Sequence, residues 1–280
     1  MAGGQERILR RRIKSIQSTK KITKAMELIA ASQIVRAQGR IAAARPYQQG
    51  MNRIVLETAL GDPVAAGRLL GTPEQVQRVA VLSVVADRGL CGGYNTFVFR
   101  ATEKLLAGFD ADGVEWRLFT VGKKAQGYFR YRGQDVEQSF TGMSERPTFT
   151  DARSVAAAVL TPFVNGEVDQ VMIVTTRFLS AGSQKVEVRQ LLPLVDPRAA
   201  ETEIFGALLE ASAAEVTARQ RAMAAATDNA GELIKKYSRI MNRARQDSIT
   251  TEIMEIVGGA EALRAGAEGD EAGLVIETRI

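Results

Sequence analysis

The turn ADRGLCGGYN (86–95) is the segment of this sequence whose residue types could most readily bind a ligand. Its glycines would let backbone amides approach a phosphate, and it follows an apolar run, a place where α/β folds often bind ligands. However, the spacing is not the G-x-G-x-x-G of a dinucleotide site. The turn is therefore either a ligand loop or a tight connection between a strand and a helix, and its spacing favours the connection.

Other potentially reactive residues have simpler structural explanations. The segment TVGKKAQG (120–127) has Gly-Lys after an apolar run, but Arg117 and Lys124 occupy positions where a phosphate-binding P-loop needs Gly and Ser/Thr. Cys91 could be a thiolate nucleophile, yet the sequence contains no histidine to activate it, and a small, partly buried side chain is favoured.

The lack of histidine also excludes histidine triads and histidine–metal sites, and leaves carboxylate or lysine chemistry. Glu252 and Glu255 could form an acid–base pair, but they flank an apolar helix face that includes Ile249. A solvated helix edge explains them better.

Positive charge is concentrated near the N-terminus. Residues 1–57 contain twelve Lys or Arg and three Glu, whereas the whole chain has a net charge of +5. Lys20, Lys21 and Lys24, with the arginines at 10–12, are clustered enough to bind nucleic acid, anionic lipid or an acidic protein surface. No aromatic residue lies within 1–45, so stacking on single-stranded nucleic acid is not supported.

Two long helices are expected to position these residues at the ends of the chain. The first covers residues 5–45, with an apolar face at Ile13, Ile16, Ile22, Met26 and Ile29, and should bend or end at Arg45-Pro46 before a second helix over 47–60. The C-terminal helix covers 201–263. Its apolar positions follow the 4,3 spacing of a coiled coil: Ala226, Ala230, Leu233, Tyr237, Ile240 and Ala244.

Strand and helix patterns alternate between the two end helices. The apolar run VAVLSVVAD (79–87) predicts a strand buried on both faces, DVEQSFTG (135–142) an edge strand, and KVEVRQLLPL (185–194) an antiparallel return. The predicted fold class is α/β: an antiparallel coiled coil of N- and C-terminal helices with an inserted Rossmann-like α/β domain. The expected divisions are 1–60, 75–195, 201–263 and a flexible tail, 264–280.

Several motifs resemble the gamma subunit of F-type ATP synthase. They are RIKSIQSTKKITKAMELIAASQIVRAQ (12–38), DRGLCGGYN (87–95), RQLLPL (189–194) and AMAAATDNAGELIKKYSRIMNRARQDSITTEIMEIVGGAEAL (222–263). The match covers both end helices and, more loosely, the whole insert.

The resemblance implies a central rotor shaft without catalytic residues, cofactor or metal. Its coil would enter a hexamer of alternating alpha and beta subunits, and its base would dock on the membrane ring of c subunits with the epsilon subunit. Lys20, Lys21 and Lys24, beside Met26, would face acidic loops of beta. Arg243, Arg245 and Gln246 would make polar contacts with beta near the same level. Ile253, Ile256 and Val257 would turn in an apolar sleeve at the top of the hexamer.

In one segment the sequence departs from this family. About twenty residues that the family carries between RQLLPL and the final helix are missing, because the helical pattern resumes by Glu203. No apolar run is long enough to span a bilayer, and the single cysteine favours a reducing compartment. The resemblance implies a location at the cytoplasmic face of the bacterial inner membrane, and the absence of a clear transit peptide favours this over an organelle. A small-ligand α/β enzyme and a basic, nucleic-acid-binding coiled coil remain the alternatives.

Overall fold

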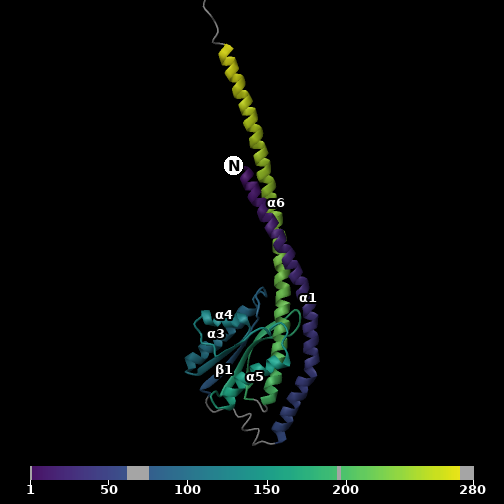
Figure 1. The fold of residues 1–280 in the computed structure, drawn as a ribbon, viewed down its shortest axis with the longest axis vertical. Helices are drawn as coiled ribbons and strands as arrows, with labels where there is room; N and C mark the ends of the chain where they lie inside the picture. Colours follow the sequence, from purple (N-terminus) through teal and green to yellow (C-terminus); the bar gives the residue numbers. More distant parts are fainter. Residues whose placement is uncertain (1, 62–75, 194–196, 272–280) are drawn as a thin grey trace, which may run out of the picture. The chain divides into compact units, whose positions relative to one another are not determined.

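The computed structural model describes residues 2–61, 76–193 and 197–271, which fall into two compact units. The coil unit consists of residues 1–23 and 226–280, and the domain unit consists of residues 24–225. Two long helices, α1 (Ala2–Gly61) and α6 (Pro197–Glu271), contribute a segment to each unit. Five strands and three helices lie between them in the described chain, and the predicted fold class is confirmed (Figure 1).

The domain unit is built on one mostly parallel sheet with strand order β3-β2-β1-β4-β5. Parallel pairing joins β1 to β2 and β4, and β2 to β3, whereas β5 runs antiparallel to β4 as predicted. The elements in chain order are β1 (Arg78–Val84), α3 (Tyr94–Asp112), β2 (Glu115–Val121), α4 (Lys123–Tyr131), β3 (Gln138–Phe140), α5 (Phe149–Val164), β4 (Gln170–Phe178) and β5 (Gln184–Leu192).

Helices cover both faces of this sheet. Alternate residues of β1 point to opposite faces: Leu82 packs with α5 and the first part of α6, and Val81 packs with α3 and α4. Six of the seven β1 residues are buried, which explains the continuous apolar run in the sequence. The segment of α6 up to residue 225 is therefore a core helix of the domain, and its buried positions extend around most of its circumference.

Both end helices are longer than predicted. Helix α1 continues through Pro46 to Gly61, so of the two expectations for Arg45-Pro46, a bend or an end, the end was wrong. Ala42, whose carbonyl loses its hydrogen bond to Pro46, is exposed, so water can satisfy it. Helix α6 continues past residue 263 to Glu271, so the first part of the expected tail is helical. Residues 272–280, the rest of that tail, lie outside the described part of the chain, as do 62–75 and 194–196.

The seam of the coil unit agrees only in part with the predicted one. On α6 the predicted Ala230 is buried, but Thr227 is buried as well, and the predicted Leu233 and Ile240 are 42% and 40% exposed. On α1, Leu9, Ile13 and Thr23 are buried and Ile22 is exposed. The seam therefore combines large apolar side chains, Leu9 and Ile13, with small and hydroxyl side chains. A 4,3 spacing fits more than one set of positions on α6, so it does not single out Thr227.

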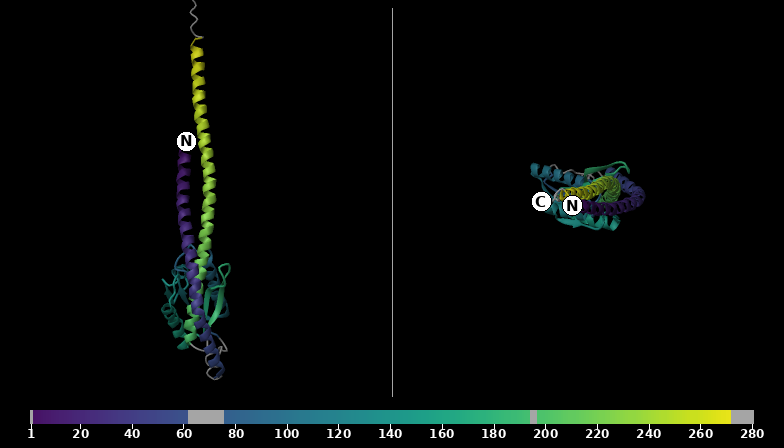
Figure 2. Two further views of the ribbon diagram at one scale, coloured as in Figure 1. Left: turned by 90° about the vertical axis from the view of Figure 1, so that its right-hand side faces the viewer. Right: turned by 90° about the horizontal axis from the view of Figure 1, so that it is seen from above.

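The register of the coil unit is antiparallel. The hydroxyls of Thr23 and Thr227 share a buried hydrogen bond of 2.8 Å, and the Arg12 guanidinium lies 5.2 Å from the centre of the Tyr237 ring. Moving toward the N-terminus of α1 thus corresponds to moving toward the C-terminus of α6 (Figure 2). A buried polar pair of this kind favours one register, because any slip would break the hydrogen bond between the two hydroxyls across the seam.

Candidate partner-binding surfaces

The first candidate surface is the basic segment of α1, defined here as Lys20, Lys21 and Lys24. All three side chains are exposed. Among the described residues, Lys20 and Lys21 have no carboxylate partner, whereas Lys24 donates to Glu27 at 3.0 Å. That exposed pair contributes about 0–1 kcal/mol, so an acidic partner could replace Glu27 at little cost.

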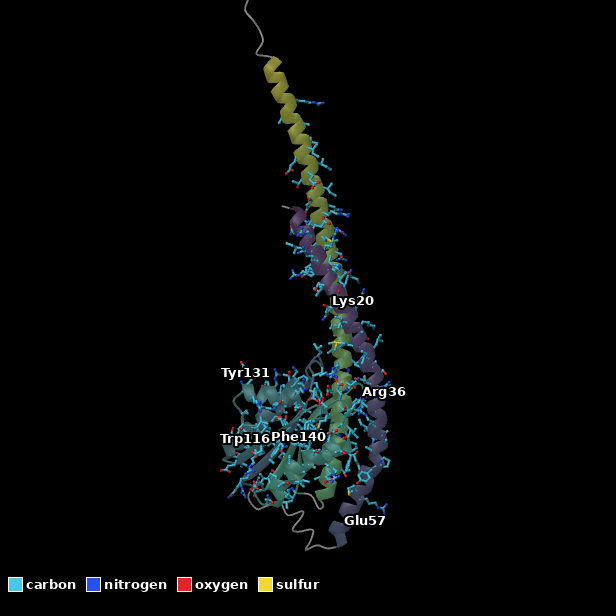
Figure 3. The ribbon with its side chains drawn as sticks, viewed as in Figure 1. Lys20, Arg36, Glu57, Trp116, Tyr131 and Phe140 are labelled. Carbon is cyan, nitrogen blue, oxygen red and sulfur yellow. The ribbon has the colours of Figure 1, made fainter. Side chains whose placement is uncertain are left out.

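Lys20 lies across a glycine of the facing helix in the coil unit (Figure 3). A Cβ atom added to Gly231 would lie 3.1 Å from the Lys20 Nζ atom. The glycine thus gives the lysine stem room to extend over α6. Met26, which the sequence places beside the basic segment, is half-buried in the domain unit.

Gly231→Ala is expected to raise the free energy of unfolding by about 0.5–1 kcal/mol, because alanine is the better helix former and the flexible Lys20 head can move aside. Denaturant unfolding followed by circular dichroism measures the change. Gly258→Ala is the control for helix propensity alone, because nothing lies within 4 Å of its added Cβ. Destabilisation by Gly231→Ala alone would show that Lys20 is held in place.

A second group, Arg243, Arg245 and Gln246 on α6, is exposed as expected but does not lie level with Lys20. Lys20 faces Gly231, and Arg243 is twelve residues further along the helix, or about 18 Å at 1.5 Å per residue. The expectation of one shared level was therefore wrong. The register of the antiparallel coil explains the difference in level, because it brings these arginines opposite the first residues of α1.

The third candidate surface is the apolar end of α6, defined here as Ile253, Ile256 and Val257. These side chains are 54%, 72% and 48% exposed. Continuing the register of the coil unit brings the first residues of α1 opposite Asp247 and Ser248, so α1 does not cover the apolar end. Exposed apolar residues at successive turns of a helix are typical of a surface that a partner protein covers.

The turn at 86–95 is a tight connection rather than an open phosphate loop. Asp87 lies in it and accepts hydrogen bonds from three backbone amides of other segments. One belongs to Lys123, the first residue of α4, at 3.0 Å, and the others belong to Gly142 at 2.9 Å and Ser144 at 3.1 Å, in the loop after β3. Burial opposes ionisation of Asp87, but these amides together lower its pKa. The sequence did not single out Asp87 as a structural residue, although its position directly after the buried apolar run that ends at Ala86 was an available indication.

Asp87→Asn is expected to lower the free energy of unfolding by about 2 kcal/mol at pH 7, because a charged acceptor of three amide donors becomes neutral. A carboxylate whose folded pKa is lowered contributes stability above its unfolded pKa, and this stability is lost as the pH falls through the folded value. The difference between wild type and variant should therefore shrink below about pH 4. Denaturation curves at pH 7 and pH 3 would measure it, and an equal difference at both values would contradict it.

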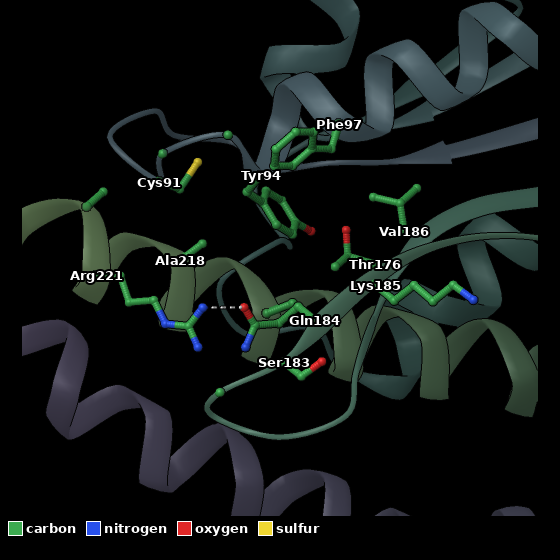
Figure 4. A pocket seen from close by; sticks show the side chains of 15 residues that line it. Cys91, Tyr94, Phe97, Thr176, Ser183, Gln184, Lys185, Val186, Ala218 and Arg221 are labelled. Atoms are coloured by element: carbon green, nitrogen blue, oxygen red, sulfur yellow. Dashed lines mark hydrogen bonds between the residues drawn. The ribbon is translucent and has the colours of Figure 1, made fainter.

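A cavity of about 880 Å³ lies beside this turn, between the start of α3, the β4–β5 connection and α6 (Figure 4). Its lining includes Cys91, Tyr94 and Arg221, but no carboxylate. Cys91 is 1% exposed, and burial, then the nearby Glu215, raise the pKa of its thiol. Burial likewise raises the pKa of Tyr94. These protonated groups do not form the nucleophile and base that a small-ligand enzyme would need.

No helix within the described ranges 2–61, 76–193 and 197–271 is long and apolar enough to cross a membrane.

The carboxylates Glu252 and Glu255 are both exposed on α6. This agrees with their interpretation as a solvated helix edge.

Comparison with known proteins identifies the class. The sequence model of the ATP synthase family matches residues 5–200 and 194–263. The ATP synthase gamma chain of Frankia casuarinae is 43% identical over 300 residues, covering 94% of this chain and 99% of the relative, and that of Mycolicibacterium gilvum is 41% identical, covering 92% and 97%. The chain belongs to the ATP synthase gamma chain family and is thus a subunit of an ATP synthase.

Solved structures show the same fold. A chain of the Euglena gracilis mitochondrial ATP synthase assembly OSCP/F1/c-ring, in rotational state 3, has a TM-score of 0.70 and 18% identity, and the match covers 99% of both chains. A chain of the central stalk and c-ring of the Tetrahymena thermophila enzyme has a TM-score of 0.62 and 22% identity, covering 73% of this chain and 99% of that one.

The comparison also bears on the shortened connection before the final helix. The alignment with the Frankia relative extends over 300 residues, more than the 280 of this chain, so that relative carries residues that this chain lacks. The two matched segments of the family model overlap at residues 194–200. About twenty residues of the family pattern are expected to be missing from this part of the sequence.

Proposed function

We propose that this chain is the non-catalytic central rotor shaft of an F-type ATP synthase, which couples proton-driven rotation to ATP synthesis at beta-subunit sites, or ATP hydrolysis to rotation. The observation that carries the proposal is the chemical difference between the two helices of the coil unit. In the part of the chain that the structure describes, α1 presents Lys20 and Lys21 without carboxylate partners, and α6 presents an apolar end that α1 does not cover. A plain structural rod would need neither surface.

This difference has a mechanical consequence inside a ring of three alpha–beta pairs. An asymmetric shaft meets each catalytic subunit with a different face, so the three sites have different nucleotide affinities at any one angle. Rotation then exchanges the affinities among the sites. The shaft acts by binding the alternative conformations of each beta subunit differently.

The surfaces of the chain suit different parts of that task. The basic segment would contact acidic loops of beta through exposed pairs, each worth about 0–1 kcal/mol, which can separate and reform during a turn. Arg243, Arg245 and Gln246 would make polar contacts about 18 Å further along the coil. Ile253, Ile256 and Val257 would turn in an apolar sleeve, where undirected contacts oppose rotation less than fixed hydrogen bonds do. Met26, half-buried, would support Lys24.

The similar solved structures, which are parts of a central stalk, a rotor and a c-ring, support the remaining partners. The base of the shaft would dock on the c-ring and the epsilon subunit, at the cytoplasmic face of the bacterial inner membrane. The curated relatives named above come from bacteria, which favours this location over an organelle.

Assembly tests the proposal. The purified chain, mixed with alpha and beta subunits of a bacterial relative, should elute with them at one copy for every three alpha–beta pairs. The chain alone should hydrolyse no ATP. A different stoichiometry would contradict the shaft, and hydrolysis by the pure chain would contradict its non-catalytic role.

A further inference from the structure

Three arginines of the domain unit surround a small cavity that has no role in the proposed function. Arg36 and Arg40 come from α1, and Arg146 comes from the loop between β3 and α5. The cavity has a volume of about 230 Å³. Its other lining residues are Gln33, Glu145 and Val216. We call it the arginine pocket; Arg36 is labelled in Figure 3.

The positive charge of the arginine pocket is not neutralised by the protein residues that the structure describes. Arg40 donates to the backbone carbonyl of Glu145 at 3.2 Å, not to its carboxylate. That carboxylate instead lies 3.3 Å from Arg88. Within the described ranges, Arg36, Arg40 and Arg146 form no salt bridge. The pocket therefore has three guanidinium groups and one carboxylate that a fourth arginine already holds.

The pKa of Arg40 is consistent with this excess of positive charge in the pocket. Partial burial, followed by the charge of Arg146, lowers the pKa of Arg40. Arginine stays charged in proteins, so the repulsion is not relieved by loss of a proton. An anion between the guanidinium groups would relieve it.

We propose that the arginine pocket binds a phosphate-class oxyanion, either free phosphate or a terminal phosphoryl group of a nucleotide. Guanidinium groups present paired N–H donors that match two oxygens of a phosphate, and three of them converge on this space. The volume is below the roughly 300–1,000 Å³ of pockets that enclose a whole drug-sized ligand. A single phosphate-sized group therefore fits better than a complete nucleotide, whose base and sugar would remain outside.

A bound anion would connect elements that are far apart in the sequence. Its arginines belong to α1 and to the loop that contains Glu145, and Ser212 of α6 donates to the Glu145 carbonyl at 2.9 Å. The same loop contains Ser144, which donates to Asp87. Oxyanion binding would thus stiffen the contacts of α1 with the rest of the domain unit, and would make its stability depend on phosphate concentration.

Isothermal titration calorimetry of the full chain with sodium phosphate, at low and constant ionic strength, tests the proposal. Saturable binding of one phosphate is expected. Arg36→Gln and Arg146→Gln should each weaken it about tenfold or more, because each removes charge-assisted hydrogen bonds. Both side chains are exposed, so folding should persist; circular dichroism checks this. Arg130→Gln, an exposed arginine on α4, is the matched control and should bind phosphate as wild type does.

Parallel titrations with ADP and ATP distinguish the two sources. If Arg36→Gln and Arg146→Gln also weaken the binding of ADP or ATP, the pocket binds the phosphoryl group of a nucleotide. If only phosphate binds, the ligand of the pocket is the free ion. Absence of saturable binding by any of the three ligands would overturn the proposal. Equal affinity for phosphate in the wild type and in both pocket variants would also overturn it. A further titration with an acidic peptide would overturn it if the peptide binds and phosphate does not displace it.

Discussion

Reversing the charge of the basic segment, by Lys20→Glu, Lys21→Glu and Lys24→Glu together, is expected to lower the coupled ATPase and the ATP-driven torque of the assembled complex about tenfold or more. If each lysine contributes about 0.5 kcal/mol through an exposed pair, the loss for three is about 1.5 kcal/mol, which corresponds to about tenfold. Repulsion between the new carboxylates and acidic loops of beta adds to this loss.

The control for this experiment is a second triple reversal with the same change in net charge. Lys104, Lys123 and Arg130 are exposed cations on α3 and α4, and changing each to Glu should leave coupling unaltered. Neutralising Lys20, Lys21 and Lys24 to Gln should give an intermediate loss that high salt reproduces in the wild type. Full torque in the charge-reversed shaft would exclude the basic segment as a contact with beta.

Arg219→Met is expected to lower the free energy of unfolding by about 3–5 kcal/mol at pH 7, the largest effect of any single substitution considered. Arg219 donates to Glu215 at 2.6 Å, and the two side chains are 8% and 0% exposed. Methionine fills similar space but leaves the carboxylate buried without its cation. The double variant with Glu215→Leu should recover most of the loss, because two apolar side chains of similar volume replace a buried ion pair.

The stability deficit of Arg219→Met is expected to depend on pH in a definite direction. Burial already raises the pKa of Glu215, and Arg219 opposes that effect. Without Arg219 the folded pKa rises further above the unfolded one. Such a carboxyl group contributes stability that is fully present below its unfolded pKa and is lost as the pH rises through the folded pKa. The deficit of Arg219→Met should therefore be small near pH 4 and grow toward pH 7. A deficit that is constant over this range would contradict the role assigned to Glu215.

The α/β domain could be predicted from the sequence because its patterns are local. The buried β1 strand appears as an uninterrupted apolar run, and the antiparallel β5 follows a short turn after β4. The coil could be predicted as a class for the same reason. Its seam could not, because 4,3 spacing fits more than one set of positions, and the buried Thr23–Thr227 pair resembles ordinary surface residues in the sequence.

Contacts between residues far apart in the sequence explain the other omissions. Asp87 binds amides of Lys123, Gly142 and Ser144, and the arginine pocket joins Arg40 to Arg146. Nothing in a single sequence connects positions so far apart. The level of Arg243 along the coil was likewise misjudged because it depends on the antiparallel register, which only the structure provides.

Rotation itself is the most direct test of the proposed shaft. The α4 side chain of Tyr131 is 88% exposed, so Tyr131→Cys supplies an accessible thiol for a probe. The native Cys91 is buried and its thiol pKa is raised, so it should not compete for the label. The labelled chain would be assembled with an immobilised hexamer of alpha and beta subunits. The proposed function predicts rotation of the probe in one direction, dependent on ATP, with three pauses in each turn. A probe that stays still or only fluctuates, in a hexamer that contains one copy of the chain and hydrolyses ATP, would contradict it.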